Sequence, residues 1–276
     1  MAQFWRGFTN NRAAVLGLAI LIVIVMFGAL APILYPGDPF RRVGTAFQPP
    51  LGNFFFGTDV LGRDVGAQLA HGVRISLMIG FAATGLAVLL ATAIGGIAGY
   101  YGGWTDEILM RITEFFQTIP SFLFAILLIA ILSPSIWSIV LAIGVVTWPP
   151  ITRLVRGEFK AMRNREFVQA CVALGMRDLP IMFREILPNC LSPILVIASL
   201  SIASAILIES ALAFLGLGDP NVISWGYMVG VGRPYLRTAW WLCAVPGMAI
   251  LLTVLAINLV GEGLNDALNP RLRNQR

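Results

Sequence analysis

The side chains that most often catalyse reactions or bind metals are scarce in this sequence, and their spacing fits neither role. The chain has one histidine, His71, and three cysteines, Cys171, Cys190 and Cys243. No two cysteines form a CxxC pair, so the spacing predicts neither a zinc site nor a disulfide framework. We interpret the cysteines as small apolar residues, and we expect no catalytic residue and no metal site.

Nucleotide binding also lacks its usual motif. A phosphate-binding loop of the GxxxxGK[ST] type places a glycine directly before the lysine, whereas the only lysine, Lys160, follows Gly157-Glu158-Phe159. The enzyme motifs HExxH and GxSxG do not occur either. We therefore expect this chain to bind no cofactor and to catalyse no reaction itself.

The composition is that of a membrane protein. Hydrophobic residues make up 58% of the 276 residues and charged residues only 12%, and the apolar residues are concentrated in blocks. The net charge of +5 is divided among separate loops. A nucleic-acid-binding surface would gather that charge in one patch, so the pattern argues against such a partner.

Six apolar segments are long enough to cross a bilayer as helices. The first, residues 13–34, has no charge over 22 positions. A cleaved signal peptide is the alternative, because Ala29-Leu30-Ala31 resembles a cleavage site, but the apolar run is too long for one. The other predicted spans are residues 75–101, 107–132, 136–153, 186–210 and 238–261.

Proline and glycine mark turns and close contacts between these spans. The charge-free run 115–152 would make about 57 Å of straight helix, so it must fold back, and Ser133-Pro134-Ser135 supplies the turn. Pro149-Pro150 is expected to end or kink the helix that follows. Three glycines spaced four residues apart would let a neighbouring helix approach closely: Gly95, Gly99 and Gly103.

The basic residues predict the orientation. Thirteen of the 19 lie on one side of the membrane: in the N-terminus, in the loops after the second and fourth spans with Arg111 and Arg153 at the adjoining span ends, and in the C-terminal tail. The positive-inside rule therefore places residues 1–12, the loop 154–185 and the tail 266–276 in the cytoplasm. Residues 35–74 then form an extracytoplasmic segment.

The cytoplasmic loop contains an amphipathic stretch. Apolar residues recur in it at helical spacing: Phe167, Ala170, Cys171 and Leu174. This predicts a short helix from Arg165 to Leu174 with a narrow apolar strip. Gly175 is expected to end it in a left-handed conformation, and a second short helix is expected to begin near Pro180. The alternative is a strip that lies on lipid headgroups.

The register of this loop resembles the EAA motif of bacterial ABC importer permeases: EAA, three residues, Gly, nine residues, Ile, one residue and Leu-Pro. Gln169-Ala170-Cys171 stands at the EAA position, Gly175 follows after three residues, and Leu187-Pro188 falls at the required distance. Gln169, Cys171 and Glu185 depart from the general pattern.

The resemblance covers most of residues 50–275 and is greatest to the second permease of the dipeptide, oligopeptide and nickel importers. The similar stretches are GTDVLGRDV (57–65), HGVRISL (71–77), AGYYGGWTDEILMR (98–111), ESALAFLGLG (209–218), SWGYM (224–228) and AINLVGEGLNDALNPRLR (256–273). Glu262 and Asn265 stand where Asp and a basic residue are expected.

This resemblance implies an all-α type I ABC importer permease fold with six transmembrane helices in the bacterial inner membrane. It implies four kinds of partner: a homologous permease in a heterodimer, two cytoplasmic ATPases that bind ATP and Mg, an extracytoplasmic solute-binding protein, and membrane lipid. Peptide is the substrate it indicates first, while nickel, opines and other small solutes stay open.

In that family the short loop helix docks on the ATPase and transmits its closure. We expect the apolar strip to insert there, Gly175 to set the bend, and the charged residues to form a polar rim. The residues assigned to coupling are Arg165, Glu166, Phe167, Gln169, Ala170, Cys171, Leu174, Gly175, Arg177, Leu187 and Pro188.

Three further groups are candidates near the outer side. Glu209 is the acid deepest in an apolar run, either a gate or a packing element. Asp59, Arg63 and Asp64 are either turn and cap residues or a docking surface for the binding protein. Trp225 and Arg233 belong to a second outward loop, whose aromatic residues are either docking residues or an interfacial belt.

Two functions not coupled to ATP are the alternatives. A secondary transporter needs coupling residues near the midplane or inverted repeats, and the midplane stretches here lack charges. A channel subunit needs a filter-like loop between spans. Copurification of an ATPase with this chain would exclude both.

Overall fold

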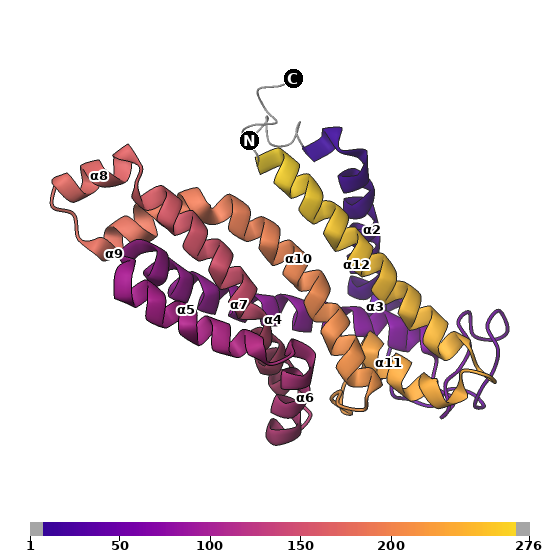
Figure 1. Ribbon diagram of the computed structural model, residues 1–276. Coiled ribbons are helices and arrows are strands. Elements are labelled where there is room, and N and C mark those ends of the chain that lie inside the picture. The colour runs from indigo at the N-terminus through magenta and orange to yellow at the C-terminus, as the bar shows by residue number, and fades with distance from the viewer. Residues whose placement is uncertain (1–7, 269–276) are drawn as a thin grey trace.

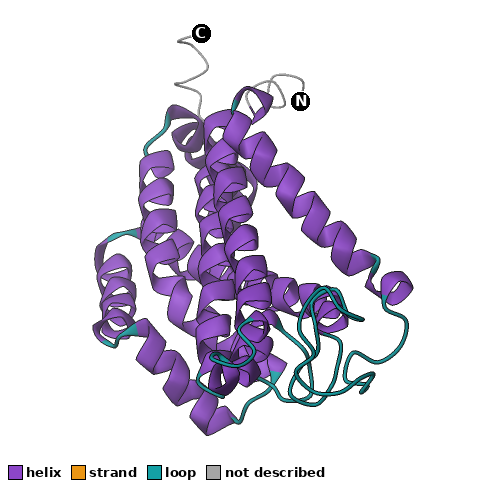
Figure 2. Ribbon diagram, turned by 90° about the vertical axis from the view of Figure 1, so that its right-hand side faces the viewer, coloured by secondary structure: helices purple, strands orange, loops and turns teal. Residues whose placement is uncertain are grey.

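The computed structural model describes residues 8–268, which form a bundle of long helices (Figures 1 and 2). The ends of the predicted cytoplasmic segments, 1–7 and 269–276, lie outside the described residues. Within 8–268 the only β-type pairing is two isolated bridges, Arg42 with Arg63 and Thr58 with Asp64. The described chain is thus helical throughout, apart from its loops.

Within residues 8–268, five long helices build the bundle, and shorter ones lie between them. The long helices are α2 (Arg12–Ala29), α4 (Val65–Tyr101), α7 (Ile136–Arg163), α10 (Leu187–Phe214) and α12 (Trp241–Leu268). The shorter ones are α3 (Ala31–Leu34), α5 (Gly103–Thr118), α6 (Ser121–Leu132), α8 (Glu166–Ala173), α9 (Asp178–Pro180), a π-helix (Ile181–Ile186), α11 (Trp225–Gly232) and a 3-10 turn (Arg233–Tyr235).

Among the described residues, five helices are long and apolar enough to cross a membrane, counting Asp178–Phe214 as one continuous helix. The pair α5 and α6 adds a sixth if its two halves are counted as one span. The two ends of the bundle differ (Figure 1): α8 lies at the end toward which the C-terminus of α12 points, whereas α11 and residues 35–64 lie at the opposite end.

Helices α4 and α7 pack along each other at the centre of the fold. A Cβ at Gly95 would lie 2.6 Å from the Thr152 carbonyl oxygen, and one at Gly99 would lie 2.6 Å from the Arg156 carbonyl oxygen. Both glycines therefore bring the two backbones into contact, as predicted. Gly103 does not take part, because it begins α5 after a turn and has no neighbouring atom in that space.

The third predicted span, 107–132, is not one straight helix. Helices α5 and α6 meet at 84° across Ile119 and Pro120. The proline ring disfavours the helical conformation in the residue before it, and Ile119 is extended, at φ −88° and ψ 127°. The predicted turn at Ser133 is present, with φ +68°.

Two outcomes are expected for Pro149-Pro150, an end or a kink of the fourth helix, and the end is not found there. Helix α7 continues through both prolines to Arg163, ten residues beyond the predicted limit. Prolines are tolerated inside helices of membrane proteins because neighbouring helices support the backbone. The C-terminal turns of α7 therefore extend the bundle toward α8.

The other helices also differ in extent from the predicted spans. Helix α4 begins ten residues earlier than expected, at Val65, since the Asp64 carboxylate accepts a hydrogen bond from the Gly66 N–H and caps it. Helix α12 extends to Leu268. In the first span, α2 ends at Ala29 and α3 follows, with Pro32 in its first turn.

Candidate functional site

The predicted loop helix is present as α8, between the end of α7 and the start of α9 (Figure 1). Arg165 is its N-cap and Leu174 its C-cap. Gly175 has φ +74°, which confirms the predicted left-handed end. The N–H groups of Gly175 and Met176 donate to the carbonyls of Val172 and Cys171, so the helix ends in a Schellman motif.

Most of the predicted apolar strip faces away from the bundle. The side chain of Leu174 is 82% exposed and that of Phe167 is 38% exposed, with Ala170 exposed between them. The residues predicted for the polar rim, Arg165, Glu166 and Arg177, are exposed as well. Gln169 is also exposed.

Cys171 departs from the predicted strip. It is half-buried and packs against the apolar core at this end of the bundle. Val168, which sequence reasoning missed, is the anchor of α8, with only 1% of its surface exposed. Val168 and Cys171 are three residues apart and share a face of the helix. Helix α8 therefore has two apolar strips, and the sequence pattern did not predict the buried one.

The loop does not form two separate short helices. From Asp178 the chain is helical through α9 and the π-helix into α10, so the fifth span extends eight residues beyond the predicted start. The Leu187 N–H donates to the Met182 carbonyl, the wider bonding of a π-turn. Leu187 is half-buried and Pro188 exposed, both within this helix.

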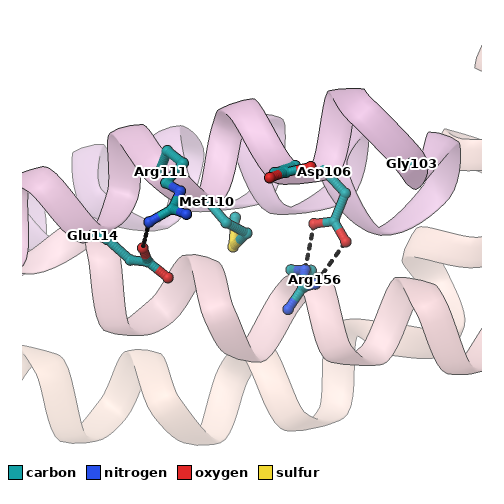
Figure 3. A pocket seen from close by; sticks show the side chains of 7 residues that line it. Gly103, Asp106, Met110, Arg111, Glu114 and Arg156 are labelled. Atoms are coloured by element: carbon teal, nitrogen blue, oxygen red, sulfur yellow. Dashed lines mark hydrogen bonds and ion pairs between the residues drawn. The ribbon is translucent and has the colours of Figure 1, made fainter.

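A hollow lies between α5 and α7 (Figure 3). Its volume is about 360 Å³. Arg156 donates to both oxygens of Asp106 across it, at 2.5 and 2.6 Å, a bidentate pair. Arg111 and Glu114, 3.8 Å apart, are exposed on α5. Arg153 also donates to Gln117. The contacts of Arg156 with Asp106 and of Arg153 with Gln117 fix α5 to the end of α7 that leads into α8.

Glu209 is buried in α10 with 1% of its surface exposed. The Ser224 hydroxyl donates to one of its carboxylate oxygens at 2.6 Å, and the same hydroxyl accepts from the Tyr227 N–H at the start of α11. The Ser210 hydroxyl lies 3.4 Å from the other oxygen. Glu209 therefore holds the N-terminus of α11 through Ser224, which favours the packing interpretation.

We expect Glu209→Leu to destabilise the solubilised protein by about 1–3 kcal/mol, because it removes the acceptor for a buried hydroxyl. Glu209→Gln keeps an acceptor oxygen and should lose less. Thermal unfolding in detergent measures both variants. A glutamine variant with native stability but no transport would contradict a packing role.

The three outer residues near the start of α4 mainly shape the loop. Asp59 is buried, and its carboxylate accepts from the Leu61 and Arg63 N–H groups and from the Gln68 side chain. Arg63 is partly buried, with its guanidinium 5.0 Å from the Phe40 ring centroid. Burial raises the pKa of the Asp64 cap. These contacts favour the turn and cap interpretation.

Trp225 is not available for docking. It is 1% exposed, its backbone N–H donates to the Ser76 hydroxyl, and its indole N–H donates to the Leu69 carbonyl. It therefore joins α11 to α4. Arg233 is exposed, and its guanidinium lies 4.9 Å from the Phe214 ring centroid. Of the two residues proposed on this loop, only Arg233 offers an open surface.

This arrangement matches a solved fold. The chain aligns with a chain of the structure titled "Inward facing conformations of the MetNI methionine ABC transporter: CY5 SeMet soak crystal form", with a TM-score of 0.57 and 16% identity over 76% of this chain and 96% of that one. A second form of that transporter gives a TM-score of 0.54 at the same identity, over 74% and 94% of the two chains. The molecule is therefore a helical membrane subunit with the type I ABC importer permease fold, as predicted.

The chain belongs to the family of binding-protein-dependent transport system inner membrane components, which matches residues 91–274. Residues 1–50 match the N-terminal TM domain of oligopeptide transport permease C. It is a multi-pass transport permease subunit, and this family implies ATPase and binding-protein partners.

Curated relatives match over nearly the whole chain. The di/tripeptide transport system permease protein DppC of Pseudomonas aeruginosa is 39% identical over 99% of this chain and 93% of its own length. The oligopeptide transport system permease protein OppC of Bacillus subtilis is 38% identical over 96% of this chain and 88% of its own length.

Proposed function

We propose that this chain forms half of a translocation pathway that imports di- or oligopeptides, driven by ATPases that contact α8 in the cytoplasm. The observation that carries the coupling role is the open side of α8. A helix anchored by Val168, stopped by a Schellman motif and exposed at Leu174 can act as a rigid lever for a partner.

We base the proposed substrate class and partners on the curated relatives of this chain. Curated relatives at 38–39% identity are named as dipeptide, di/tripeptide and oligopeptide permeases. A homologous second permease completes the pathway, and an extracytoplasmic binding protein delivers the peptide. The N- and C-termini and α8 lie on the cytoplasmic side, as the basic loops indicate, and ATP with Mg binds only in the ATPases.

A benzophenone amino acid at Leu174 is expected to crosslink an ATPase subunit in membranes that contain the whole transporter. The matched control places it at Trp137, which is 70% exposed but belongs to the opposite end of α7. We expect ATPase capture from position 174 and none from 137. Capture of lipid alone from 174, or equal capture from both positions, would contradict the coupling role.

Uptake of labelled dipeptide into proteoliposomes tests the substrate. The complete complex, supplied with its binding protein and ATP, should accumulate peptide, and omission of ATP should stop accumulation. Accumulation that follows an ion gradient without ATP would instead support a secondary transporter.

A further inference from the structure

The structure shows a contact between α4 and the start of the fifth span that the sequence does not reveal. The Tyr100 hydroxyl, at the end of α4, donates to the Asp178 carboxylate at 2.9 Å. The two residues are 78 positions apart. Tyr100 is buried, whereas Asp178 is exposed in the first turn of α9.

This contact lies beside a hollow under α8. The hollow has a volume of about 600 Å³ and is lined by α4, α7, α8 and α9. Its wall includes Val168 and Val172 from α8 as well as the Tyr100 and Asp178 side chains. The hydrogen bond therefore joins α4 to α9 at the edge of this hollow, next to the buried apolar cluster that contains Tyr100, Val168 and Ile181.

The covalent connections around the hollow are short. Only Asn164 and Arg165 connect α7 to α8, and residues 174–177 connect α8 to α9. Helix α7 in turn contacts the backbone of α4 at Gly95 and Gly99. The chain therefore runs from α4 through α7 and α8 to α10. Helix α10 also packs on α4 farther from α8, at Gly80 and Ile206, and the Tyr100–Asp178 contact closes the ring at the end nearest α8.

A closed ring transmits a displacement differently from an open one. If α8 moves while the ring is closed, α4, α7 and the start of α10 must move together as one body. If the ring is open, the four residues around Gly175 can absorb part of the motion before α10 moves. A hydrogen bond to a carboxylate is among the stronger polar contacts available for this purpose.

We propose that Tyr100 and Asp178 are positioning residues that couple the movement of α8 to the transmembrane helices. This role rests on the proposed coupling function, and it concerns how much transport follows each ATP hydrolysed. The neighbouring Tyr101 lines the same hollow as Asp178, and the Arg163 side chain donates to the Tyr101 carbonyl, so this corner has additional polar support.

The test uses the complete transporter in proteoliposomes and measures peptide uptake and ATP hydrolysis in the same sample. We expect Tyr100→Phe and Asp178→Ala to lower the peptide transported per ATP by about tenfold, the scale of a hydrogen bond to a charged group. Asp178→Asn keeps an acceptor oxygen for the phenol and should restore most of the ratio. Tyr227→Phe removes a phenol from α11 and serves as the matched control.

The combination of variants separates this role from a general loss of structure. Tyr100→Phe with Asp178→Ala should be no worse than either alone, because both remove the same contact. An unchanged ratio in both single variants, or additive losses in the double variant, would overturn the proposal. If crosslinking from Leu174 captures an ATPase while the ratio stays unchanged, only the role of the Tyr100–Asp178 contact fails, and the coupling function stands.

Discussion

Gly99→Leu is expected to prevent the protein from accumulating in the membrane. A Cβ at this position would lie 2.6 Å from the Arg156 carbonyl oxygen and 2.7 Å from the Phe159 Cβ. Since the first of these is backbone, no change of side-chain conformation can relieve the overlap, and α4 must separate from α7. We expect destabilisation of about 3 kcal/mol or more, a large part of the stability of a typical domain.

The same substitution elsewhere in α4 provides the control. Gly85 is exposed, and a Cβ there would have no neighbour within 4 Å. Gly85→Leu should therefore reach the membrane at the native level, as an immunoblot of the membrane fraction can show. Equal levels of the two leucine variants would contradict the close contact between α4 and α7.

Gly175→Val is expected to lower peptide uptake at least tenfold without preventing assembly. With φ at +74° this residue occupies the left-handed region, where a β-branched side chain is strained by about 1–3 kcal/mol. The strain is purely conformational, because a Cβ at Gly175 would meet nothing within 4 Å. The valine variant should therefore change the angle at which α8 leaves the bundle.

Asparagine is the matched substitution, because it also adds a side chain at this position but tolerates the left-handed region. Gly175→Asn should retain more than half of native uptake, and both variants should retain the copurifying ATPase in comparable amounts. Valine and asparagine variants with equal uptake would show that the backbone conformation of this residue does not matter for coupling.

The sequence predicted local features well. The apolar runs identified the long helices, and Gly95 and Gly99 identified a close helix contact, because glycine spacing depends only on neighbouring residues. Gly175 identified the end of α8 for the same reason. The effect of each proline was harder to predict, since a proline breaks a helix only where no neighbouring helix supports the backbone. Pro120 breaks its helix and Pro149 does not.

Contacts between distant segments were beyond sequence reasoning. Val168 and Cys171 lie on the buried side of α8 only because α7 and the π-helix approach there, and nothing in the local pattern distinguishes that strip from the exposed one. Trp225 was expected at a surface, yet a tryptophan in an aromatic loop is equally suited to a buried position with a hydrogen bond to its indole. The Asp178 contact depends on α4, 78 residues earlier.

The π-turn at Ile181–Ile186 has a consequence for the direction of the loop. A π-turn holds one residue more than an α-helical turn, and each residue of an α-helix corresponds to about 100° of rotation. Everything before this turn is therefore rotated about the axis of α10 relative to a regular helix. In a related permease with one residue fewer here, the loop that carries α8 would point in a different direction around the axis of α10. A single insertion or deletion can therefore change which neighbouring protein α8 contacts, while the transmembrane bundle stays the same.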